Sequence, residues 1–304
     1  MLLRFFYLML CVFFTQTSSS FAHTYPLALD TYLIGKVRST VTQNHQDLLK
    51  LGLQNNLGYY EMLEANPQLH PKQIFRGTQV TLPTQFILPN APREGVVVNL
   101  AELRLYLYPT NHSQVMTYPV GIGKFGWETP TGDAEILDKR KDPKWYVPES
   151  VYLDAQKRGI NIPKVWPAGP KNPLGEYAMR ISIPSYDIHG TNREDGVGRR
   201  TSAGCIRMLN KDVAELFDNI DVGTKVTIVN QPFKIGVKDK IIYLEAHAPL
   251  YEQIVANKKA NVISEAKQII NAFLIKYKSS IVDWDKVTQV VEQSSGIPSP
   301  IGVI

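Results

Sequence analysis

Cysteine is scarce in this chain of 304 residues, which has only Cys11 and Cys205. Two cysteines are too few for a disulfide framework, so an ordinary hydrophobic core must hold the fold together. A mean hydropathy of −0.16 excludes a multi-span membrane protein, and 20 glycines and 20 prolines exclude a collagen-like or low-complexity chain. The net charge of +5 permits an anionic partner but does not require one.

The N-terminus has the pattern of an export signal. Arg4 precedes an apolar run over residues 5–14, and Ser20-Phe-Ala22 fits the small-x-small cleavage pattern. We expect a signal peptide over residues 1–22, cleaved near Ala22, and a periplasmic protein; an uncleaved anchor is the alternative. Cleavage removes Cys11 and leaves Cys205 as the sole cysteine, which is then either buried and inert or kept for its reactivity.

Three parts are expected after residue 22. Residues 23–90 form a small α/β unit, residues 91–231 a β-rich unit, and residues 232–304 a strand followed by a helical region. The helical region is predicted from apolar residues at helical spacing between 262 and 277, which is typical of a packing face.

The first part has a strand–helix–helix–strand order, with elements predicted at residues 32–34, 46–53, 59–65 and 77–82. Asn66-Pro67 marks the turn after the second helix, and Pro83 ends the closing strand. This order resembles a LysM domain, a module that binds sugar polymers. Gly35-Lys-Val-Arg38 stands where such domains carry Gly-Asp-Thr-Leu. The resemblance implies glycan binding, and a purely structural role is the alternative.

Short strands dominate residues 91–231. Apolar and alternating runs predict strands at 95–100, 103–108, 114–120, 177–183, 186–189 and 224–229. One helix is expected, with Asn210 as its N-cap residue. Many short strands with Pro- and Gly-rich connections are typical of a mainly β fold, a sandwich or a barrel, with little helix.

The segment Gly121-Ile-Gly123-Lys-Phe-Gly126 matches the G-x-G-x-x-G fingerprint of dinucleotide-binding proteins. That fingerprint needs a helix at its last glycine, and the following Trp127-Glu-Thr-Pro130 disfavours one. We expect these glycines instead to allow a flat turn or to let a peptide approach the backbone closely. The six histidines are scattered without an i,i+4 pair. We therefore expect no metal, organic cofactor, nucleotide or nucleic-acid partner.

The residues best suited to chemistry lie between 189 and 208. A thiol nucleophile needs a base, donors for the developing oxyanion and a positioned substrate. His189, at the end of a predicted strand, can supply the base for Cys205. Gly204 lets backbone N–H groups around Cys205 point into a site. Arg207 faces the same side of an extended segment as Cys205 and offers a cation for a carboxylate.

Residues 189–191 and 202–207, His-Gly-Thr followed by Ser-Ala-Gly-Cys-Ile-Arg, resemble the signature of the YkuD-type L,D-transpeptidase catalytic domain. Residues 99–106, 118–123, 129–132 and 167–175 are similar to the ErfK/YbiS/YcfS/YnhG branch of that family. Ala203 stands where many members carry a second histidine. The resemblance implies the following roles: Cys205 and His189 are catalytic, Gly204, Ser202 and Gly190 form the oxyanion site or orient it, and Arg207, Thr191 and Asn192 bind substrate.

The family resemblance also implies an activity. Members act on peptidoglycan stem peptides, at the bond between the L-centre of a diamino acid and a terminal D-alanine. The acyl acceptor is a lysine of an outer-membrane protein or lipoprotein, or the diamino acid of another stem, which gives a 3→3 crosslink. Water as acceptor gives an L,D-carboxypeptidase or hydrolase. A non-catalytic wall-binding protein is the alternative from another class, and the sequence does not separate the acceptors.

Overall fold

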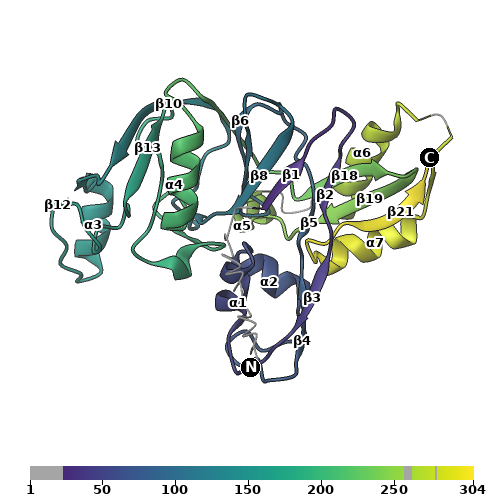
Figure 1. Cartoon of the computed structure of the whole chain (residues 1–304), viewed down its shortest axis with the longest axis horizontal. Coiled ribbons are helices and arrows are strands. Elements are labelled where there is room, and N and C mark those ends of the chain that lie inside the picture. Colours follow the sequence, from purple (N-terminus) through teal and green to yellow (C-terminus); the bar gives the residue numbers. More distant parts are fainter. Residues whose placement is uncertain (1–22, 257–261, 278) are drawn as a thin grey trace, which may run out of the picture.

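The computed structural model describes residues 23–256, 262–277 and 279–304. They form a central sheet with a smaller unit packed at each of two sides (Figure 1). The predicted export segment, residues 1–22, lies outside the described residues. Among those that are described, no helix is both long and apolar enough to cross a bilayer. The predicted mainly β fold class is confirmed.

Nine strands make up the central sheet. Their bounds are β1 (His23–Pro26), β6 (Gly95–Asn99), β7 (Arg104–Tyr108), β8 (Gln114–Pro119), β10 (Gly132–Lys141), β13 (Tyr177–Ile181), β14 (Asp187–His189), β16 (Ile206–Arg207) and β17 (Lys225–Val229). They lie in the spatial order β1-β8-β7-β6-β17-β10-β13-β14-β16. Two 2.8 Å hydrogen bonds between Gly121 and Arg207 bring the last strand back to the segment after β8, so the sheet curls toward closure.

The concave side of this curled sheet is filled by an apolar core of Val, Leu and Ile side chains from nearly all of its strands. Helix α4 (Asn210–Asn219) packs on β13 and β14 through Val213 and Leu216. The predicted N-cap role of Asn210 is wrong, because Leu209 occupies that position. The Asn210 side chain instead bonds both backbone groups of Thr191, each at 3.0 Å, which would otherwise lack partners inside the fold.

Residues 33–87, here called the N-terminal unit, have the predicted strand–helix–helix–strand order. Helices α1 (Leu48–Gln54) and α2 (Tyr59–Ala65) lie between strands β3 (Arg38–Val41) and β4 (Gln79–Leu82), which pair with each other. The strand predicted at 32–34 forms as β2 (Leu33–Gly35), but it pairs with β5 (Gln85–Ile87). Strand β3 is missing from the prediction because it is largely exposed and carries no apolar alternation.

Residues 142–176 leave the central sheet between β10 and β13 and form an excursion. It contains α3 (Glu149–Lys157) and the strand pair β11 (Trp145–Tyr146) and β12 (Val165–Trp166). Lys124, just after β9 (Ile122–Gly123), lies 3.8 Å from Asp154 of α3. Helix α3 is absent from the prediction because Ala155 is its only buried residue, so apolar periodicity is missing.

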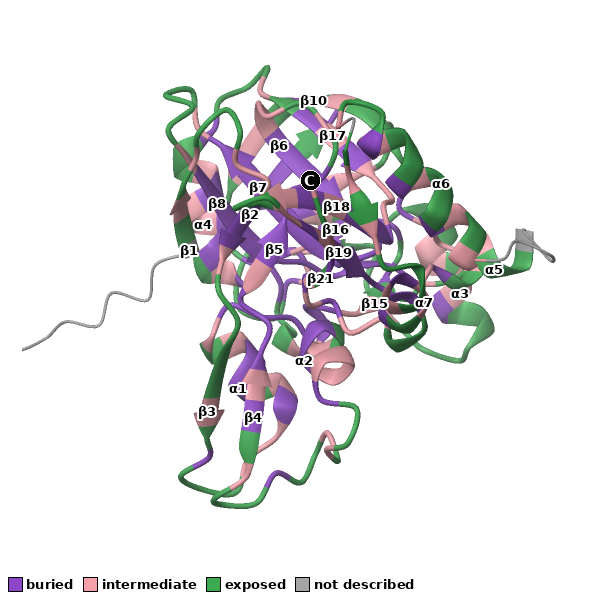
Figure 2. Ribbon diagram, turned by 90° about the vertical axis from the view of Figure 1, so that its right-hand side faces the viewer, coloured by how far each residue is buried: buried purple, intermediate pink, exposed green. Residues whose placement is uncertain are grey.

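The C-terminal unit, residues 232–304, has more strands than predicted. Its four-stranded sheet, with helices packed against it, has its own apolar core. The elements are β18 (Phe233–Lys238), β19 (Ile241–Ala246), α5 (Tyr251–Ala256), α6 (Val262–Leu274), β20 (Ile281–Val282), α7 (Trp284–Gln293) and β21 (Ser299–Val303). Figure 2 shows that buried residues gather in the strands at the centre of the molecule, whereas β3 is largely exposed.

Candidate active site

Parallel strands β14 and β16 bring the predicted catalytic residues together. Ile188 pairs with Ile206 and His189 with Arg207, and both isoleucines are buried in the core of the sheet. Since side chains alternate along a strand, His189 and Arg207 lie on the opposite face. Cys205, two residues before Arg207, shares that face. The register therefore places the nucleophile, the base and the cation predicted from the sequence on one surface.

His189 is held with one defined nitrogen available. The side chain is only 3 % exposed, and its Nδ1 lies 2.6 Å from the carbonyl oxygen of Gly190. A carbonyl only accepts, so Nδ1 carries the proton, and the lone pair of the neutral ring is on Nε2. The ring also makes a hydrogen bond with the backbone of Leu174. Burial lowers the pKa of His189 to about 3, and the nearby charge of Arg207 acts in the same direction. The ring is therefore a neutral base at pH 7.

Cys205 is partly buried, with Sγ 3.9 Å from the carbonyl oxygen of Ser185. Burial raises the pKa of the Cys205 thiol to about 11, although the Asp187 N–H and the charges of Arg207 and Arg140 act in the opposite direction. The resting pair is therefore a thiol and a neutral imidazole. Proton transfer to His189 has to accompany attack on the substrate, because no preformed thiolate is available.

A short turn, residues 202–205, presents the thiol. The Ser202 hydroxyl donates to the carbonyl oxygen of Cys205 at 2.6 Å and accepts from the Gly204 N–H at 3.1 Å. Thr129 donates to the Gly204 carbonyl at 2.6 Å. At Gly204 φ is +109°, and a Cβ there would lie 2.6 Å from the Tyr186 ring. Only glycine fits this turn, as its place in the predicted signature requires.

The Gly204 N–H, a predicted donor of the oxyanion site, already donates to the Ser202 hydroxyl. In the part of the chain that the structure describes, the Cys205 N–H donates to no acceptor. Of the two amides, that of Cys205 is the one available to a developing oxyanion. Ser202 acts by fixing the turn around it.

Arg207 is buried over much of its length and faces the same surface. Its NH1 group lies 3.4 Å from Thr201 Oγ1, and its Nε is a buried donor without a partner among the described residues. Burial lowers the pKa of Arg207, but the guanidinium remains charged. An enclosed cation with an unused donor is suited to a carboxylate.

Backbone segments are held by Thr191 and Asn192, the other predicted substrate-binding residues, and by Gly190, predicted to orient the oxyanion site. Thr191 Oγ1 accepts from the Arg193 N–H at 3.0 Å and donates to the Arg193 carbonyl at 3.1 Å. Asn192 donates to the Lys171 carbonyl at 2.9 Å. Gly190 donates to the Tyr177 carbonyl at 3.0 Å, and a Cβ there would lie 2.2 Å from Asn210 Oδ1. In this structure these three residues fix the loops beside His189.

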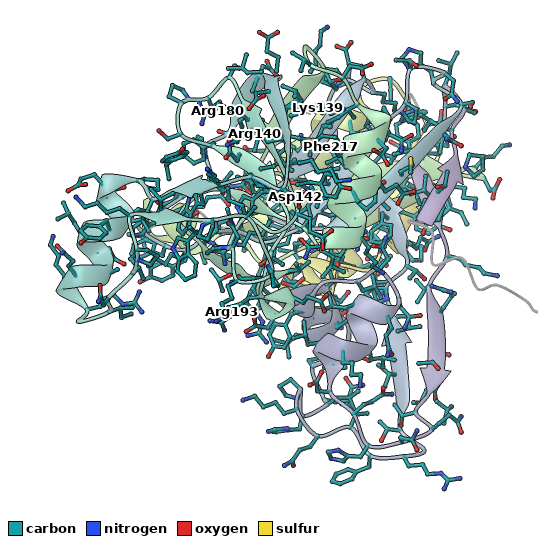
Figure 3. The ribbon with its side chains drawn as sticks, turned by 60° about the vertical axis from the view of Figure 1, so that its left-hand side comes forward. Lys139, Arg140, Asp142, Arg180, Arg193 and Phe217 are labelled. Atoms are coloured by element: carbon teal, nitrogen blue, oxygen red, sulfur yellow. The ribbon has the colours of Figure 1, made fainter. Side chains whose placement is uncertain are left out.

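Two residues of the site escaped the prediction. Thr129 holds Gly204, and its only sequence signal is its place in the Thr-Pro-Thr-Gly segment shared with the family. Asp187 lies on β14 and is contacted by Arg140 of β10 at 2.9 Å and by Arg180 of β13 at 3.8 Å. Figure 3 labels both arginines on these neighbouring strands. Nothing local in the sequence connects residues 140, 180 and 187, because the sheet alone brings them together.

A second cluster has the residue types of a metal site. Glu102, Glu245 and His247 are buried with their ligand atoms within 4.8 Å of one another. The ammonium of Lys234 lies 2.6 Å from Glu102 and 2.8 Å from Glu245. Burial lowers the pKa of His247, but hydrogen bonds to Glu245 and Glu64 outweigh it and raise that pKa to about 10. Two cations of the chain itself therefore balance these carboxylates.

Comparison with known proteins defines the class. The profile of the YkuD family, described as an L,D-transpeptidase catalytic domain, matches residues 93–228. The protein named "Probable L,D-transpeptidase YcfS" of Escherichia coli is 36 % identical over 285 residues, 91 % of this chain and 88 % of that protein. "Probable L,D-transpeptidase ErfK/SrfK" of the same species is 37 % identical over 294 residues, 93 % of this chain and 92 % of that protein.

A solved structure, the Ldtfm–avibactam carbamoyl enzyme, is 20 % identical, with a TM-score of 0.37, and covers 46 % of this chain and 50 % of that chain. The long alignments with the E. coli proteins establish the family. This chain belongs to the YkuD family of L,D-transpeptidases.

Proposed function

We propose that this L,D-transpeptidase works by cysteine acyl transfer on peptidoglycan stem peptides, with Cys205 as nucleophile and His189 as base. The observation that carries the proposal is the shared face of β14 and β16. It holds a thiol, a neutral imidazole whose Nδ1 is fixed by Gly190, and an enclosed guanidinium. This combination supplies the base and the carboxylate anchor that a thiol needs for acyl transfer.

In the first half-reaction, Cys205 attacks the carbonyl at the L-centre of the diamino acid in a tetrapeptide stem. His189 Nε2 takes the thiol proton, and a C–S bond forms while the carbonyl oxygen becomes an oxyanion. The Cys205 N–H stabilises that oxyanion, because Ser202 already occupies the Gly204 N–H. His189 then protonates the nitrogen of D-alanine, the C–N bond breaks, and a thioester remains.

In the second half-reaction, an amine attacks the thioester. His189 takes a proton from the amine and returns it to the departing sulfur, so Cys205 leaves as the thiol. The acceptor amine belongs to a lysine of an outer-membrane protein or to the diamino acid of another stem. Water in the same position gives hydrolysis. We propose an exported, periplasmic enzyme, since both donor and acceptor belong to the cell wall.

Arg207 binds a carboxylate of the donor stem in this proposal. Its Nε donor is unused, and no carboxylate of the described residues forms an ion pair with it, which leaves one charge to be matched by substrate. Loops fixed by Thr191, Asn192 and Asn210 keep this surface in place. The N-terminal unit, with its LysM-like order, contributes contact with the glycan strand that carries the stems.

Purified protein incubated with tetrapeptide muropeptides tests the proposal. Mass spectrometry should find D-alanine release, and a Cys205-linked acyl intermediate should be trapped when the acceptor is withheld. Cys205→Ala should abolish both signals, and His189→Gln should lower the rate of acylation. Continued D-alanine release by Cys205→Ala would overturn the mechanism. Adding a lysine-bearing peptide or a second stem then identifies the acceptor from the mass of the product.

A further inference from the structure

The N-terminal unit touches the catalytic part through two glycines. A Cβ on Gly58, the residue before α2, would lie 2.7 Å from the Cα of Gly198. A Cβ on Gly198 would lie 2.2 Å from the backbone nitrogen of Tyr59. Backbone meets backbone here, and the Tyr60 N–H donates to the Gly198 carbonyl at 3.1 Å. The Arg199 guanidinium also lies 3.7 Å over the Tyr59 ring.

The other side of the same loop is held by the central sheet. Gly198 N–H donates to the Val120 carbonyl at 3.1 Å, and Ile122 N–H donates to that of Arg199 at 3.0 Å. A Cβ on Gly121 would lie 2.3 Å from the carbonyl oxygen of Gly196. Residues 196–199 are therefore clamped between the start of α2 and the segment after β8. At Gly58 and Gly198, and again at Gly121 and Gly196, backbone lies directly against backbone.

The loop of residues 196–199 also packs against Arg207, the proposed carboxylate-binding residue. A Cβ on Gly196 would lie 3.5 Å from NH1 of Arg207, so the guanidinium packs directly over this backbone. Gly121, which contacts the loop at Gly196, also makes two backbone hydrogen bonds with Arg207. Strand β15 (Arg200–Ser202) follows the loop at once and ends at the residue that fixes the Cys205 turn.

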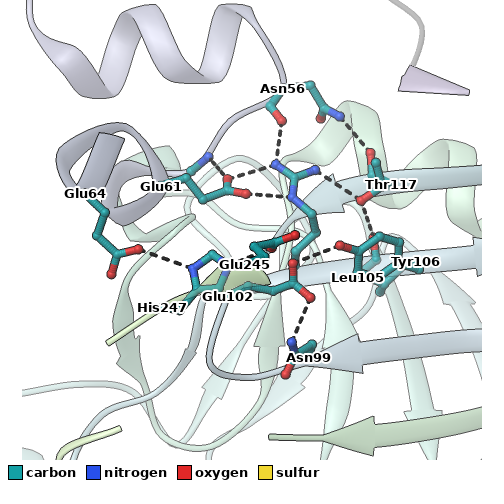
Figure 4. Close-up of polar contacts among 12 residues, drawn as sticks. Asn56, Glu61, Glu64, Asn99, Glu102, Leu105, Tyr106, Thr117, Glu245 and His247 are labelled. Carbon is teal, nitrogen blue, oxygen red and sulfur yellow. Dashed lines mark hydrogen bonds and ion pairs between the residues drawn. The ribbon is translucent and has the colours of Figure 1, made fainter. Parts of the chain in front are cut away.

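A buried ion pair keeps α2 in this position (Figure 4). Arg104 of β7 donates to both carboxylate oxygens of Glu61 on α2, at 2.6 and 2.8 Å. Glu61 also accepts from the Gly58 N–H at 2.5 Å, so the ion pair acts directly on the glycine of the contact. Arg104 further donates to the Asn56 carbonyl at 2.9 Å. The helix start is thus anchored to the central sheet by charge as well as by packing.

We infer that the N-terminal unit is a positioning element of the donor-stem site: the start of α2 sets the place of residues 196–199 and, through them, of Arg207. This inference rests on the proposed acyl transfer and adds to it that a unit outside the family domain shapes substrate binding. Cys205 and His189 depend less on this contact, because they have contacts of their own: Thr129 and Ser202 bond the turn that carries Cys205, and the Gly190 carbonyl bonds the His189 ring.

Gly58→Ala inserts one methyl group into the contact, and its effect separates binding from thiol chemistry. The KM for the donor tetrapeptide should rise about tenfold, because even small misplacement of a binding group is costly. The rate of Cys205 alkylation by iodoacetamide should change by less than about twofold, since the thiol and its base keep their contacts. The control is Gly77→Ala in the same unit, where a Cβ meets no atom within 4 Å. Because φ is +84° at Gly77, this alanine strains the N-terminal unit without touching the contact, so it controls for general destabilisation.

Tyr59→Leu tests the same contact if Gly58→Ala does not fold. It removes the ring under Arg199 and should raise KM in the same direction, whereas Tyr60→Leu, on the exposed neighbour, should not. Melting temperatures of all variants report general stability. An unchanged KM in folded Gly58→Ala, or an equal rise in Gly77→Ala at equal melting temperature, would overturn the inference.

Amide hydrogen exchange distinguishes this inference from the proposed function. Exchange at Tyr60, Gly198 and Arg207 should accelerate in Gly58→Ala without any substrate present. If the wild type neither acylates nor releases D-alanine, the proposed function fails, but the exchange result still stands. Unchanged exchange at Gly198 and Arg207 would contradict the positioning role itself.

Discussion

His189 and Arg207 are paired residues of neighbouring parallel strands, so a permanent cation lies beside the proposed catalytic base. The charge of Arg207 lowers the pKa of His189 and also acts to lower that of Cys205. It therefore disfavours an imidazolium while favouring a thiolate. The imidazole of His189 therefore stays neutral across the physiological range, and in the proposed mechanism it becomes charged only while the thiol reacts.

The pH dependence of thiol reactivity tests this arrangement. Burial raises the pKa of Cys205 to about 11, so the thiolate fraction should grow about tenfold per pH unit between about pH 6 and 9. The alkylation rate by iodoacetamide, followed by intact mass, should rise with the same slope. Cys205→Ser gives the background. A rate that is level between about pH 5 and 7 would reveal a preformed thiolate–imidazolium pair and contradict the prediction.

Arg207→Lys should impair donor binding more than chemistry. Lysine keeps the charge but loses the planar fork and the Nε donor, so kcat/KM should fall by about 10- to 100-fold, mainly through KM. Steady-state kinetics with the tetrapeptide measures the split. Arg193→Lys is the matched control, because Arg193 is 73 % exposed and paired with Asp195. An effect of equal size in the control would contradict a specific role of the Arg207 guanidinium.

The Glu61–Arg104 pair should dominate the stability of the contact between the N-terminal unit and the sheet. Glu61→Gln leaves Arg104, which is fully buried, without its counter-charge and should cost about 3–5 kcal/mol of unfolding free energy. The double variant Glu61→Leu with Arg104→Met should recover much of this loss. Urea unfolding of Glu61→Leu, Arg104→Met and the double variant closes the cycle. Additive losses would show that the two side chains do not act as a pair.

Asp212 makes stability depend on pH. Burial raises its pKa from 3.8 to about 7, so the folded state favours the protonated carboxyl, and the stability it contributes is lost between about pH 4 and 7. Asp212→Asn removes this loss. Its melting temperature relative to wild type should therefore increase from pH 4 to pH 8.

The control for this pH series is Asp218→Asn, on the exposed side of the same helix. It should show no such trend. The comparison uses the change between the two pH values, because the new amide can add a cost that is the same at both. A relative melting temperature that is flat with pH for Asp212→Asn would refute the assignment.

Much of the chemistry was predictable because it resides in short segments. His189, Cys205 and Arg207 are predicted from two short segments, by residue type, spacing and the family signature, and the strand register pairs His189 with Arg207. The mainly β class and the N-terminal helix pair also follow from local apolar patterns. The roles of Thr129 and Asp187 could not be predicted from the sequence, since each contacts a residue that only the curled sheet brings near.

Exposed elements escaped prediction for a different reason. Strand β3 and helix α3 bury too few residues to leave a periodic signal. The N-cap prediction for Asn210 failed for another reason. Asparagine is a good N-cap residue, but here its side chain bonds the backbone N–H and carbonyl of Thr191. Polar side chains near helix starts have several partners to choose from, and sequence does not rank them.

Both backbone groups of Ile87 end on charged side chains of the C-terminal unit: its N–H on Glu245 and its carbonyl on Lys234. Lys234 in turn neutralises Glu102 of the catalytic part. The three parts of the chain are therefore linked by one buried network of charged and backbone groups. Separating any part would remove the hydrogen-bond or ion-pair partner of a buried group in another part. Such a molecule should melt in a single cooperative transition. Removing residues 232–304 would destabilise the catalytic sheet as well as lose a unit.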